Sequence, residues 1–458
     1  MIENDAFKLL LINLFHLNPD DITNIVCTTF NKMMVLLVTL ADKHQTCPYC
    51  GFTAPKIKEY VTKEITHSAL TTQKCIIKYR ARRYKCPCCG KTYYEFNPFV
   101  FKSQKISILT VHNILKDLKD FNETFTSVAR RYHVSPTSVS TIFDNHVDIG
   151  RNPLPEIINF DEVYAFKSEK SKYVCVLLDF KKQIPVDVLP NRKKEYLLNY
   201  FQKIPLEERK KVKYACSDMY EVYRDVVHKV FPEAKHLLDY FHLSQDFHKK
   251  MNEVRIKIMK GYKDNKASDE YYLLKKFNWL LFKNPEDEDK HGRLFDVERE
   301  RKYNSHFKSY MNYYDLRKKL LEINNDLTIC YSLKLELVDF YSKSTIDNAK
   351  VNLEILIRSF IDTNIEEMIK FSNNLINWKQ EIINSFTIVG AEYKVEADKG
   401  QVVVCNKKVN NAIIENRNKI IKCIKNNANG YTNWLRFRNR VMYVLDPNAT
   451  FSLEPKEK

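Results

Sequence analysis

After residue 156 the chain alternates between short apolar runs and amphipathic stretches. Short apolar runs bounded by polar residues are typical of buried strands. The five runs cover residues 157–163, 173–180, 184–189, 212–217 and 234–238. Amphipathic stretches at 193–204 and 221–230 predict helices between the later strands. Three consecutive strands, followed by alternating helices and strands, predict a mixed α/β sheet, and this order suits an RNase H-like fold.

Three helix-length stretches precede the predicted sheet. Residues 106–118 and 124–132 carry apolar residues at helical intervals, and Ser135-Pro136 is a favourable helix start. This spacing predicts a helix-turn-helix domain. Four outward polar residues near the start of its third helix can reach base edges in the DNA major groove, namely Thr137, Ser138, Ser140 and Thr141. Three-helix units also occur as plain packing modules, so this pattern leaves both interpretations open.

Residues 74–82 alternate in a way that predicts a strand with one basic face. Such a face can contact DNA phosphates, or it can simply be solvated. Phosphate contact is favoured because Lys85 extends the basic cluster up to a pair of cysteines. The expected phosphate-binding residues are Lys78, Arg80, Arg82 and Arg83.

The rest of the chain shows helical or short apolar patterns. Residues 251–400 are rich in amphipathic stretches of helix length and predict an all-α region. Residues 411–425 predict one further helix. The apolar stretches at 7–15 and 33–40 are far shorter than the ~20 residues of a membrane span, so we expect them to be core elements.

Two Cys-x-x-Cys pairs flank the basic strand, and glycine follows each pair directly. Two intervening residues let one tight turn present both thiolates, and glycine allows positive φ after it. Cys47, Cys50, Cys86 and Cys89 are therefore expected to bind one zinc ion in a zinc ribbon, with Cys88 as a spare thiol. Four thiolates close the coordination shell, so this zinc is expected to be structural.

Length and charge add to this picture. A chain of 458 residues exceeds what one hydrophobic core supports, so several domains are expected. A formal net charge of +17 and a pI near 9.1 favour a polyanionic partner, although charge can also serve solubility alone. Paired cysteines without an export signal favour a reducing compartment, so we expect a cytoplasmic, nucleoid-associated protein without a membrane segment.

Several acidic residues lie where a sheet could use them for catalysis. Asp161 lies within the first predicted strand and Asp218 ends the fourth, and carboxylates so placed can hold divalent cations. Asp179 and Asp187 are equivalent by pattern alone. Asp239 and His242 are expected to support the site as an N-cap and a packed histidine. Helical periodicity does not distinguish Glu415 from Glu253 or Glu354.

The order of these parts resembles the zinc-ribbon insertion-sequence transposases of the ISL-three family, of the DDE class. The resemblance covers most of the chain and includes the cysteine pairs already described. The other matching pieces are Arg82-Arg83-Tyr84-Lys85-Cys86, Asp161 after Phe160, Asp218-Met219, Phe231-Pro232-Glu233-Ala234, Asp239-Tyr240-Phe241-His242, Glu415 with Asn418, Ile421 and Lys422, Gly430-Tyr431, and residues 433–441.

The resemblance implies an RNase H-like nuclease whose catalytic triad is Asp161, Asp218 and Glu415. These carboxylates would hold two Mg²⁺ or Mn²⁺ ions, and the partners would be double-stranded DNA of terminal inverted repeats and target sites. A homodimer or larger assembly on DNA is implied too. Asn416 replaces the glycine usual after the glutamate, and Tyr240 replaces a usual arginine.

The expected layout keeps two alternatives to a transposase. A non-catalytic DNA-binding regulator would use only the amino-terminal half, and a structure-specific nuclease would cut branched DNA with the same fold. The domains are an N-terminal element (1–45), the zinc ribbon (46–100), the helix-turn-helix domain (101–150), the first part of the catalytic core (155–250), the helical insertion (251–400), the final core helix with the third acid (401–445) and a tail (446–458).

Overall fold

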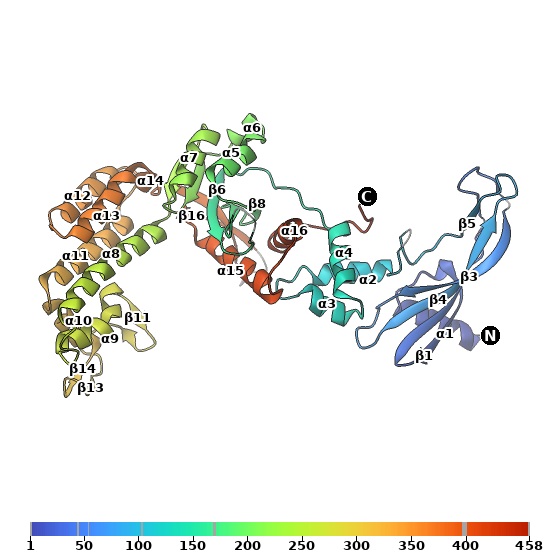
Figure 1. Ribbon diagram of the computed structural model, residues 1–458, viewed down its shortest axis with the longest axis horizontal. Helices are drawn as coiled ribbons and strands as arrows, with labels where there is room; N and C mark the ends of the chain where they lie inside the picture. Colours follow the sequence, from blue (N-terminus) through green and yellow to red (C-terminus); the bar gives the residue numbers. More distant parts are fainter. Residues whose placement is uncertain are drawn as a thin grey trace. The chain divides into compact units, whose positions relative to one another are not determined.

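The computed structural model forms two compact units (Figure 1). It describes residues 2–43, 45–53, 55–101, 104–167, 171–395 and 401–456. Unit 1 comprises Met1–Arg151, Val163–Val174 and Arg417–Lys458, and unit 2 comprises Asn152–Glu162 and Cys175–Asn416. None of the described helices is long and apolar enough to span a membrane.

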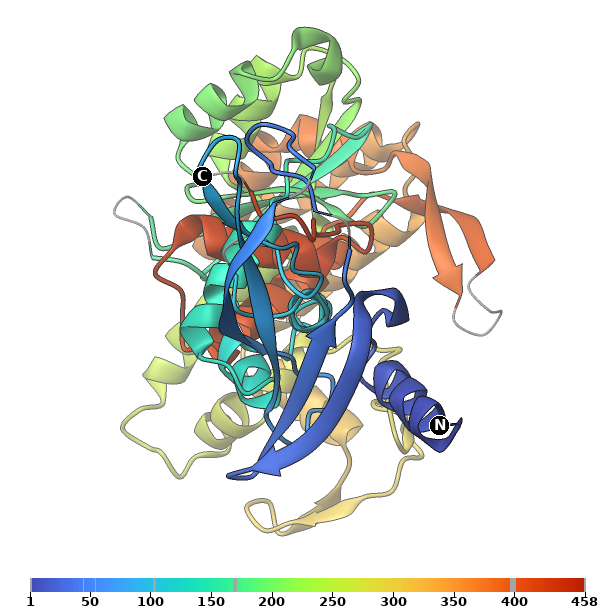
Figure 2. The same cartoon turned by 90° about the vertical axis from the view of Figure 1, so that its right-hand side faces the viewer.

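Unit 1 begins with a helix on a five-stranded sheet of order β1-β2-β4-β3, with β5 on β4. Its elements are α1 (Ile2–Leu14), η1 (Pro19–Asp21), β1 (Ile22–Phe30), β2 (Met33–Leu40), β3 (Lys56–Thr66), β4 (Cys75–Lys85) and β5 (Thr92–Tyr94). Helix α1 lies against β1 (Figure 2). Alternate residues of β4, such as Ile77 and Tyr79, are buried with the apolar face of α1. The apolar stretches at 7–15 and 33–40 thus contribute to this core, as expected from the sequence.

Unit 1 continues with four helices around a second core. They are α2 (Ile108–Asp117), α3 (Phe125–Arg131), α4 (Pro136–His146) and α16 (Trp434–Leu445). The first three match the predicted stretches, and Ser135 caps α4 by accepting a hydrogen bond from the N–H of Ser138. Helix α16 joins them through an ion pair between Arg436 and Asp144, with the closest atoms 2.6 Å apart.

Unit 2 is built on a five-stranded mixed sheet of order β10-β9-β6-β7-β8. The strands are β6 (Ile157–Val163), β7 (Val174–Asp179), β8 (Pro185–Leu189), β9 (Tyr214–Ser217) and β10 (Lys235–Leu238), and the helices between them are α5 (Lys194–Gln202), α6 (Leu206–Arg209) and α7 (Glu221–Val230). All five strands agree with the sequence prediction. Helices α5 and α7 cover one face of the sheet, while Val409 and the start of α15 (Ala412–Asn427) pack on the other.

A helical region follows the sheet and ends before residue 385. Its helices are α8 (Tyr240–Gly261), α9 (Asp269–Lys276), η2 (Asn278–Phe282), α10 (Tyr313–Glu322), α11 (Asn325–Lys343), α12 (Ala349–Ile361), α13 (Glu366–Asn377) and α14 (Lys379–Asn384). They share one large apolar core with Leu238 of β10. The last helix packs on the sheet, where the Asn384 side chain donates to the His236 carbonyl at 2.9 Å.

The expectation that this insertion is all-α is wrong. Three antiparallel hairpins interrupt or follow the helices, and residues 396–400 of the predicted insertion lie outside the described residues. The hairpins pair β11 (Glu288–Asp289) with β12 (Gly292–Arg293), β13 (Lys302–Asn304) with β14 (Ser309–Met311), and β15 (Ile388–Val395) with β16 (Gln401–Lys408). Gly292 and Lys308 have positive φ, which turns the chain back instead of continuing a helix. The third hairpin is the orange ribbon in Figure 2.

Candidate metal sites and nucleic-acid interface

Four cysteine thiols converge in unit 1. Cys47 and Cys50 precede β3, while Cys86 and Cys89 lie between β4 and β5. Their four Sγ atoms lie within 4.8 Å of one another. The Cys47 and Cys89 sulfurs are 3.7 Å apart, and those of Cys50 and Cys86 are 3.5 Å apart. Tetrahedral zinc with Zn–S bonds of about 2.3 Å has sulfur-sulfur edges of about 3.8 Å, so the cluster is compatible with zinc.

Each cysteine pair sits on a tight turn that ends in glycine. The N–H of Gly51 donates to the carbonyl of Cys47, and the N–H of Gly90 donates to the carbonyl of Cys86, both at 2.9 Å. The two glycines have φ values of +74° and +69°. A side chain is strained in this conformation, so the glycines do have the backbone role expected from the sequence. Cys88 is exposed and is not a member of the cluster.

Three aspartates lie at one edge of the sheet in unit 2. Asp161 lies in β6, Asp218 directly follows β9, and Asp239 directly follows β10. The strands β6, β9 and β10 are neighbours and run parallel, so their carboxyl ends meet at the same edge. Asp161 and Asp218 each lie two residues beyond the paired positions Asn159 and Cys216, while Asp218 and Asp239 each lie one residue beyond Ser217 and Leu238. The strand register therefore keeps the three aspartates level.

Glu415 reaches Asp239 and His242 from the first turn of α15. One ligand atom each of Asp239, His242 and Glu415 lies within 4.8 Å of the others. Asp161 and Asp218 are not members of this three-residue group, but both interact electrostatically with His242. Asp239 occupies the N-cap position of α8 without a side-chain capping hydrogen bond, which differs from the sequence interpretation. Its carboxylate is instead available to the group.

Two buried asparagines fix the start of α15 against the sheet. The Asn159 side chain in β6 donates to the side-chain oxygen of Asn411 at 2.6 Å. The Asn411 side chain donates to the Phe160 carbonyl at 3.1 Å, and its N–H donates to Asp239 at 3.4 Å. Glu415 follows one helical turn later. Sequence reasoning missed both asparagines, although their place beside Asp161 and Glu415 was a usable signal.

Burial and mutual repulsion favour protonation of these aspartates. Burial, and then the charges of Asp218 and Glu162, raise the pKa of Asp161 to about 7 against an opposing hydrogen bond from the Glu162 N–H. Burial and the Glu162 charge raise the pKa of Asp218 to about 6. Burial also raises the pKa of Asp239. Carboxylates in this arrangement stay ionised when a cation replaces the lost hydration.

Three buried polar atoms of this group find no hydrogen-bond partner within the described part of the chain. They are Oδ1 of Asp218, Oδ2 of Asp239 and Nε2 of His242. Leaving such atoms unsatisfied costs about 1–3 kcal/mol each. Oxygen-rich ligand sets suit Mg²⁺ or Mn²⁺, and an imidazole nitrogen is acceptable to Mn²⁺. The donor set therefore fits a divalent cation.

Glu162 faces a different set of partners from its neighbour Asp161. It forms an ion pair with Arg192, and the Tyr223 hydroxyl donates to it at 3.2 Å. Arg192 in turn lies over the Tyr220 ring, 4.9 Å from its centroid. These contacts connect the site to α7 and neutralise one of the charges that raises the pKa of both aspartates.

Two further aspartates of the sheet have structural contacts. Asp179 accepts hydrogen bonds from the N–H groups of Lys181 and Lys182 at 2.9 and 3.0 Å, which stabilises the turn after β7. Asp187 accepts a hydrogen bond from the Tyr200 hydroxyl at 2.7 Å. The structure thus separates them from Asp161 and Asp218, which sequence pattern alone did not.

The four basic residues predicted on β4 lie in unlike environments. Arg80 is exposed and lies over the Tyr60 ring. Lys78 pairs with Glu64 at 2.9 Å, and Arg83 pairs with Glu59 at 2.6 Å. The Arg82 side chain is only 14% exposed, pairs with Glu95 at 2.8 Å, and donates to the carbonyls of Leu40 and Ala41. The Arg82 guanidinium therefore has its contacts inside the fold.

Helix α4 presents the predicted polar residues at its start. Thr137 and Thr141 are exposed, while the hydroxyls of Ser138 and Ser140 contact Ser135 and the Pro136 carbonyl. Three of the four residues, all but Ser140, line a cavity of about 290 Å³. Val139, Ile142 and Phe143 are buried on the opposite face. This is the inside-outside division expected from the sequence.

Comparison with known proteins relates the segment that contains this sheet to the transposases. A family model of the ISL3 type, described as a transposase, matches residues 158–397. The chain therefore belongs to the ISL3 family of DDE transposases. The matched segment includes Asp161, Asp218, Asp239 and His242, whereas Glu415 lies beyond its end.

A more distant similarity points the same way. The transposase for insertion sequence element IS1001 from Bordetella parapertussis is 19% identical to this chain over 246 residues. The aligned part is 53% of this chain and 60% of that protein, so the chain spans less than two thirds of this relative.

Proposed function

We propose that the protein is an active DDE transposase of an insertion sequence. It would bind the terminal inverted repeats of its element and catalyse metal-dependent DNA strand cleavage and strand transfer. The observation that carries this proposal is that Asp161, Asp218 and Asp239 lie level at one sheet edge, and that Asp239 lies with His242 and Glu415 in a group whose ligand atoms are within 4.8 Å of one another. Buried ligand atoms of Asp218, Asp239 and His242 have no hydrogen-bond partner among the described residues. A regulator that only binds DNA has no need of such a costly group.

An RNase H-like core is the fold proposed for unit 2. The strand order β8-β7-β6-β9-β10 supports it, because the first three strands are consecutive and adjacent. The next two strands, β9 and β10, add parallel on the other side of β6. Under this proposal the core covers residues 155–250 and 401–445, and so includes residues 163–174 and 417–445 of unit 1. The region 251–400 is then an insertion.

Asp161, Asp218 and Glu415 are proposed to hold two Mg²⁺ or Mn²⁺ ions. Such ions polarise the phosphate and activate a water or DNA 3′-hydroxyl when bound. The three carboxylates act as ligands in this scheme and do not serve as general bases. Asp239 and His242 lie close enough to orient Glu415 or to complete the ligand set. Asn159 and Asn411 position the helix that carries Glu415.

DNA binding is assigned to unit 1. The helix α4 would place Thr137, Ser138 and Thr141 in the major groove, with Ser140 beside them. Arg80 and, after opening of their ion pairs, Lys78 and Arg83 would contact phosphates. Arg82 is proposed to hold the ribbon together, because its contacts lie inside the fold. The zinc of the four cysteines would be structural, and a homodimer or larger assembly would join two element ends.

Acid-to-amide substitutions test the catalytic proposal. Asp161→Asn, Asp218→Asn and Glu415→Gln should each abolish cleavage of a labelled repeat-end duplex in Mg²⁺, while the affinity for that duplex is retained. Glu354→Gln is the matched control, because Glu354 is also a helical glutamate but pairs with Lys379 at 2.7 Å. A fully active Glu415→Gln protein refutes Glu415 as third ligand. Equal cutting of branched DNA without a repeat would favour a structure-specific nuclease.

A further inference from the structure

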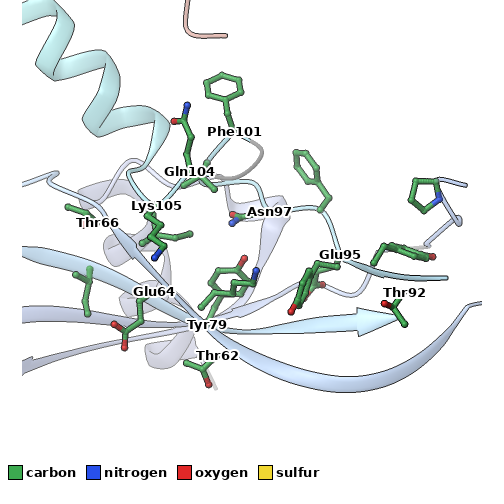
Figure 3. A pocket seen from close by; sticks show the side chains of 18 of the residues that line it. Thr62, Glu64, Thr66, Tyr79, Thr92, Glu95, Asn97, Phe101, Gln104 and Lys105 are labelled. Atoms are coloured by element: carbon green, nitrogen blue, oxygen red, sulfur yellow. The ribbon is translucent and has the colours of Figure 1, made fainter. Parts of the chain in front are cut away.

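A wide groove lies on the sheet of unit 1, next to the first cysteine turn. Its volume is about 1420 Å³, and strands β3, β4 and β5 and the segment after β5 supply its walls. Figure 3 shows Tyr79 on the sheet and Asn97, Phe101 and Gln104 on the segment that follows β5. This volume is too large for a single side chain or ion.

Three aromatic side chains in this groove are exposed to solvent. Phe96 is 74% exposed, Tyr49 is 57% exposed and Tyr94 is 41% exposed. All three lie close to the cysteine turns, on the loop of the first pair or on and after β5. Large apolar side chains gathered on a surface are typical of a binding site, because covering them with a partner is favourable.

Lysines accompany the exposed rings. Lys63 Nζ lies 3.9 Å from the centroid of the Tyr94 ring, and Lys91 Nζ lies 4.6 Å from that of Tyr49. Lys74 and Lys105 also line the groove, and neither forms an ion pair within the described residues. A polyanion that carries planar groups would pair its negative charges with the lysines and stack its planar groups on the aromatic rings.

The acids of the groove are already neutralised. Glu64 pairs with Lys78 at 2.9 Å, and Glu95 pairs with Arg82 at 2.8 Å. The Glu95 side chain is only 4% exposed. The groove therefore has a surplus of unpaired positive charge, which is complementary to a phosphate backbone.

We propose that this groove binds a segment of single-stranded DNA. Unpaired bases would stack on Tyr49, Tyr94 and Phe96, while Lys74 and Lys105 contact the phosphates between them. An unpaired strand is favoured over duplex DNA because the faces of its bases are accessible to aromatic side chains, whereas a duplex stacks them internally. The groove adjoins the cavity beside helix α4, because Gln104 and Lys105 line both. None of the acids of unit 2 lines it, so the single-strand proposal does not rest on the proposed catalysis.

Fluorescence anisotropy of the full, zinc-loaded chain tests the groove. The probes are a fluorescein-labelled oligodeoxythymidine of about 20 nucleotides, long enough to pass a typical single-strand site, and a duplex of the same length. The Tyr49→Ala/Phe96→Ala double variant should bind the single strand about tenfold or more weakly, with less than about threefold loss for the duplex. The matched control is Tyr303→Ala/Tyr310→Ala, which removes two equally exposed aromatics from the β13–β14 hairpin.

Several results would overturn the proposal. The first is that the wild-type chain does not bind the single strand. The second is that the double variant loses as much affinity for the duplex as for the single strand, or that the Tyr303/Tyr310 control loses as much single-strand affinity. The third is that the wild-type chain binds an RNA of uniform uridine more tightly than the oligodeoxythymidine. Zinc content is measured for every variant. If the double variant has lost zinc, the single variant Phe96→Ala replaces it in the test, because Phe96 lies outside both cysteine turns. Phe96→Trp keeps an aromatic ring and should then retain single-strand binding.

Discussion

The cysteine cluster of unit 1 and the acid cluster of unit 2 are both candidate metal sites, but they are assembled in different ways. The cysteines come from two turns of the same design, each closed by a glycine of positive φ. The acids lie in β6, directly after β9, directly after β10 and in α15, and their positions span residues 161 to 415, with His242 of α8 beside them. Local turn geometry determines the first site, whereas the second depends on the register of a whole sheet.

This difference has a consequence for stability. The thiolates need only two short turns to meet, and a zinc ion bound there would contribute folding free energy to the segment that carries them. The acids are held in place by a sheet and by buried asparagines. Removal of metal should therefore unfold the ribbon but leave the sheet of unit 2 intact.

The largest expected effect is the loss of a zinc ligand. Cys47→Ser or Cys86→Ser should remove zinc and unfold the ribbon, because structural zinc contributes on the order of 10 kcal/mol to small domains. Zinc measured by mass spectrometry and the protease sensitivity of residues 46–100 report the result. Cys88→Ser is the control and should retain full zinc, since Cys88 is outside the cluster. Undiminished zinc in Cys86→Ser would contradict the assignment.

Loss of the asparagine bridge should have the next largest effect. Asn411→Ala removes the side-chain contacts to Asn159 and Phe160, so Glu415 is no longer held against the sheet. We expect the affinity for Mn²⁺ and the cleavage rate to fall about 10- to 100-fold, as for other groups that orient ligands. Asn410→Ala serves as the control. Unchanged metal affinity in Asn411→Ala would show that α15 is positioned by other contacts.

A smaller effect concerns pH. Burial and the Asp218 charge raise the pKa of Asp161 to about 7, so metal-free stability should fall as pH rises from about 4 toward 7. Asp161→Asn avoids this cost and should melt about 2–8 °C higher than the wild type at pH 7.5 in EDTA. The difference in melting temperature between the two proteins should disappear near pH 4 and change sign in saturating Mn²⁺. A wild type that is the more stable protein in EDTA at pH 7.5 contradicts this account.

The smallest expected effects compare two arginines of β4. Arg80→Ala should weaken duplex binding severalfold and lower the slope of log affinity against log salt by about 1, because one phosphate contact is lost. Arg82→Ala should instead lower the melting temperature of the ribbon, since Arg82 holds Glu95 and two carbonyls. Binding isotherms at several salt concentrations and thermal melts separate the two. Equal changes of DNA affinity and melting temperature in both variants would contradict the different roles given to Arg80 and Arg82.

Much of the fold follows from patterns of short range. The strands of unit 2 and the helices α2, α3 and α4 agree with the sequence because burial imposes a continuous apolar run on each strand and a helical period on each helix. The hairpins at 288–311 were missed, since charged two- and three-residue strands carry no apolar period. The sheet that joins β2 to β4 was also not foreseen, because pairing between strands far apart in the sequence leaves no local pattern.

The sites show the same limit. Spacing alone was enough to find the four cysteines, whereas Asp161 and Asp218 could not be told from Asp179 and Asp187 until their contacts were known. The family resemblance supplied Glu415, and the structure places Asp239 and His242, which the sequence indicated only as supporting residues, next to it. Arg82 fits a basic face by its position in the strand, yet its guanidinium turns back to Glu95.

The central claim is that carboxylates from distant parts of the chain form one site for divalent cations. Calorimetric titration of Mn²⁺ into the zinc-loaded protein tests it most directly. The account predicts that the wild type and Glu354→Gln bind Mn²⁺ with equal affinity, and that Asp161→Asn, Asp218→Asn and Glu415→Gln each lose most of that affinity. Wild-type affinity for Mn²⁺ in Glu415→Gln would contradict it.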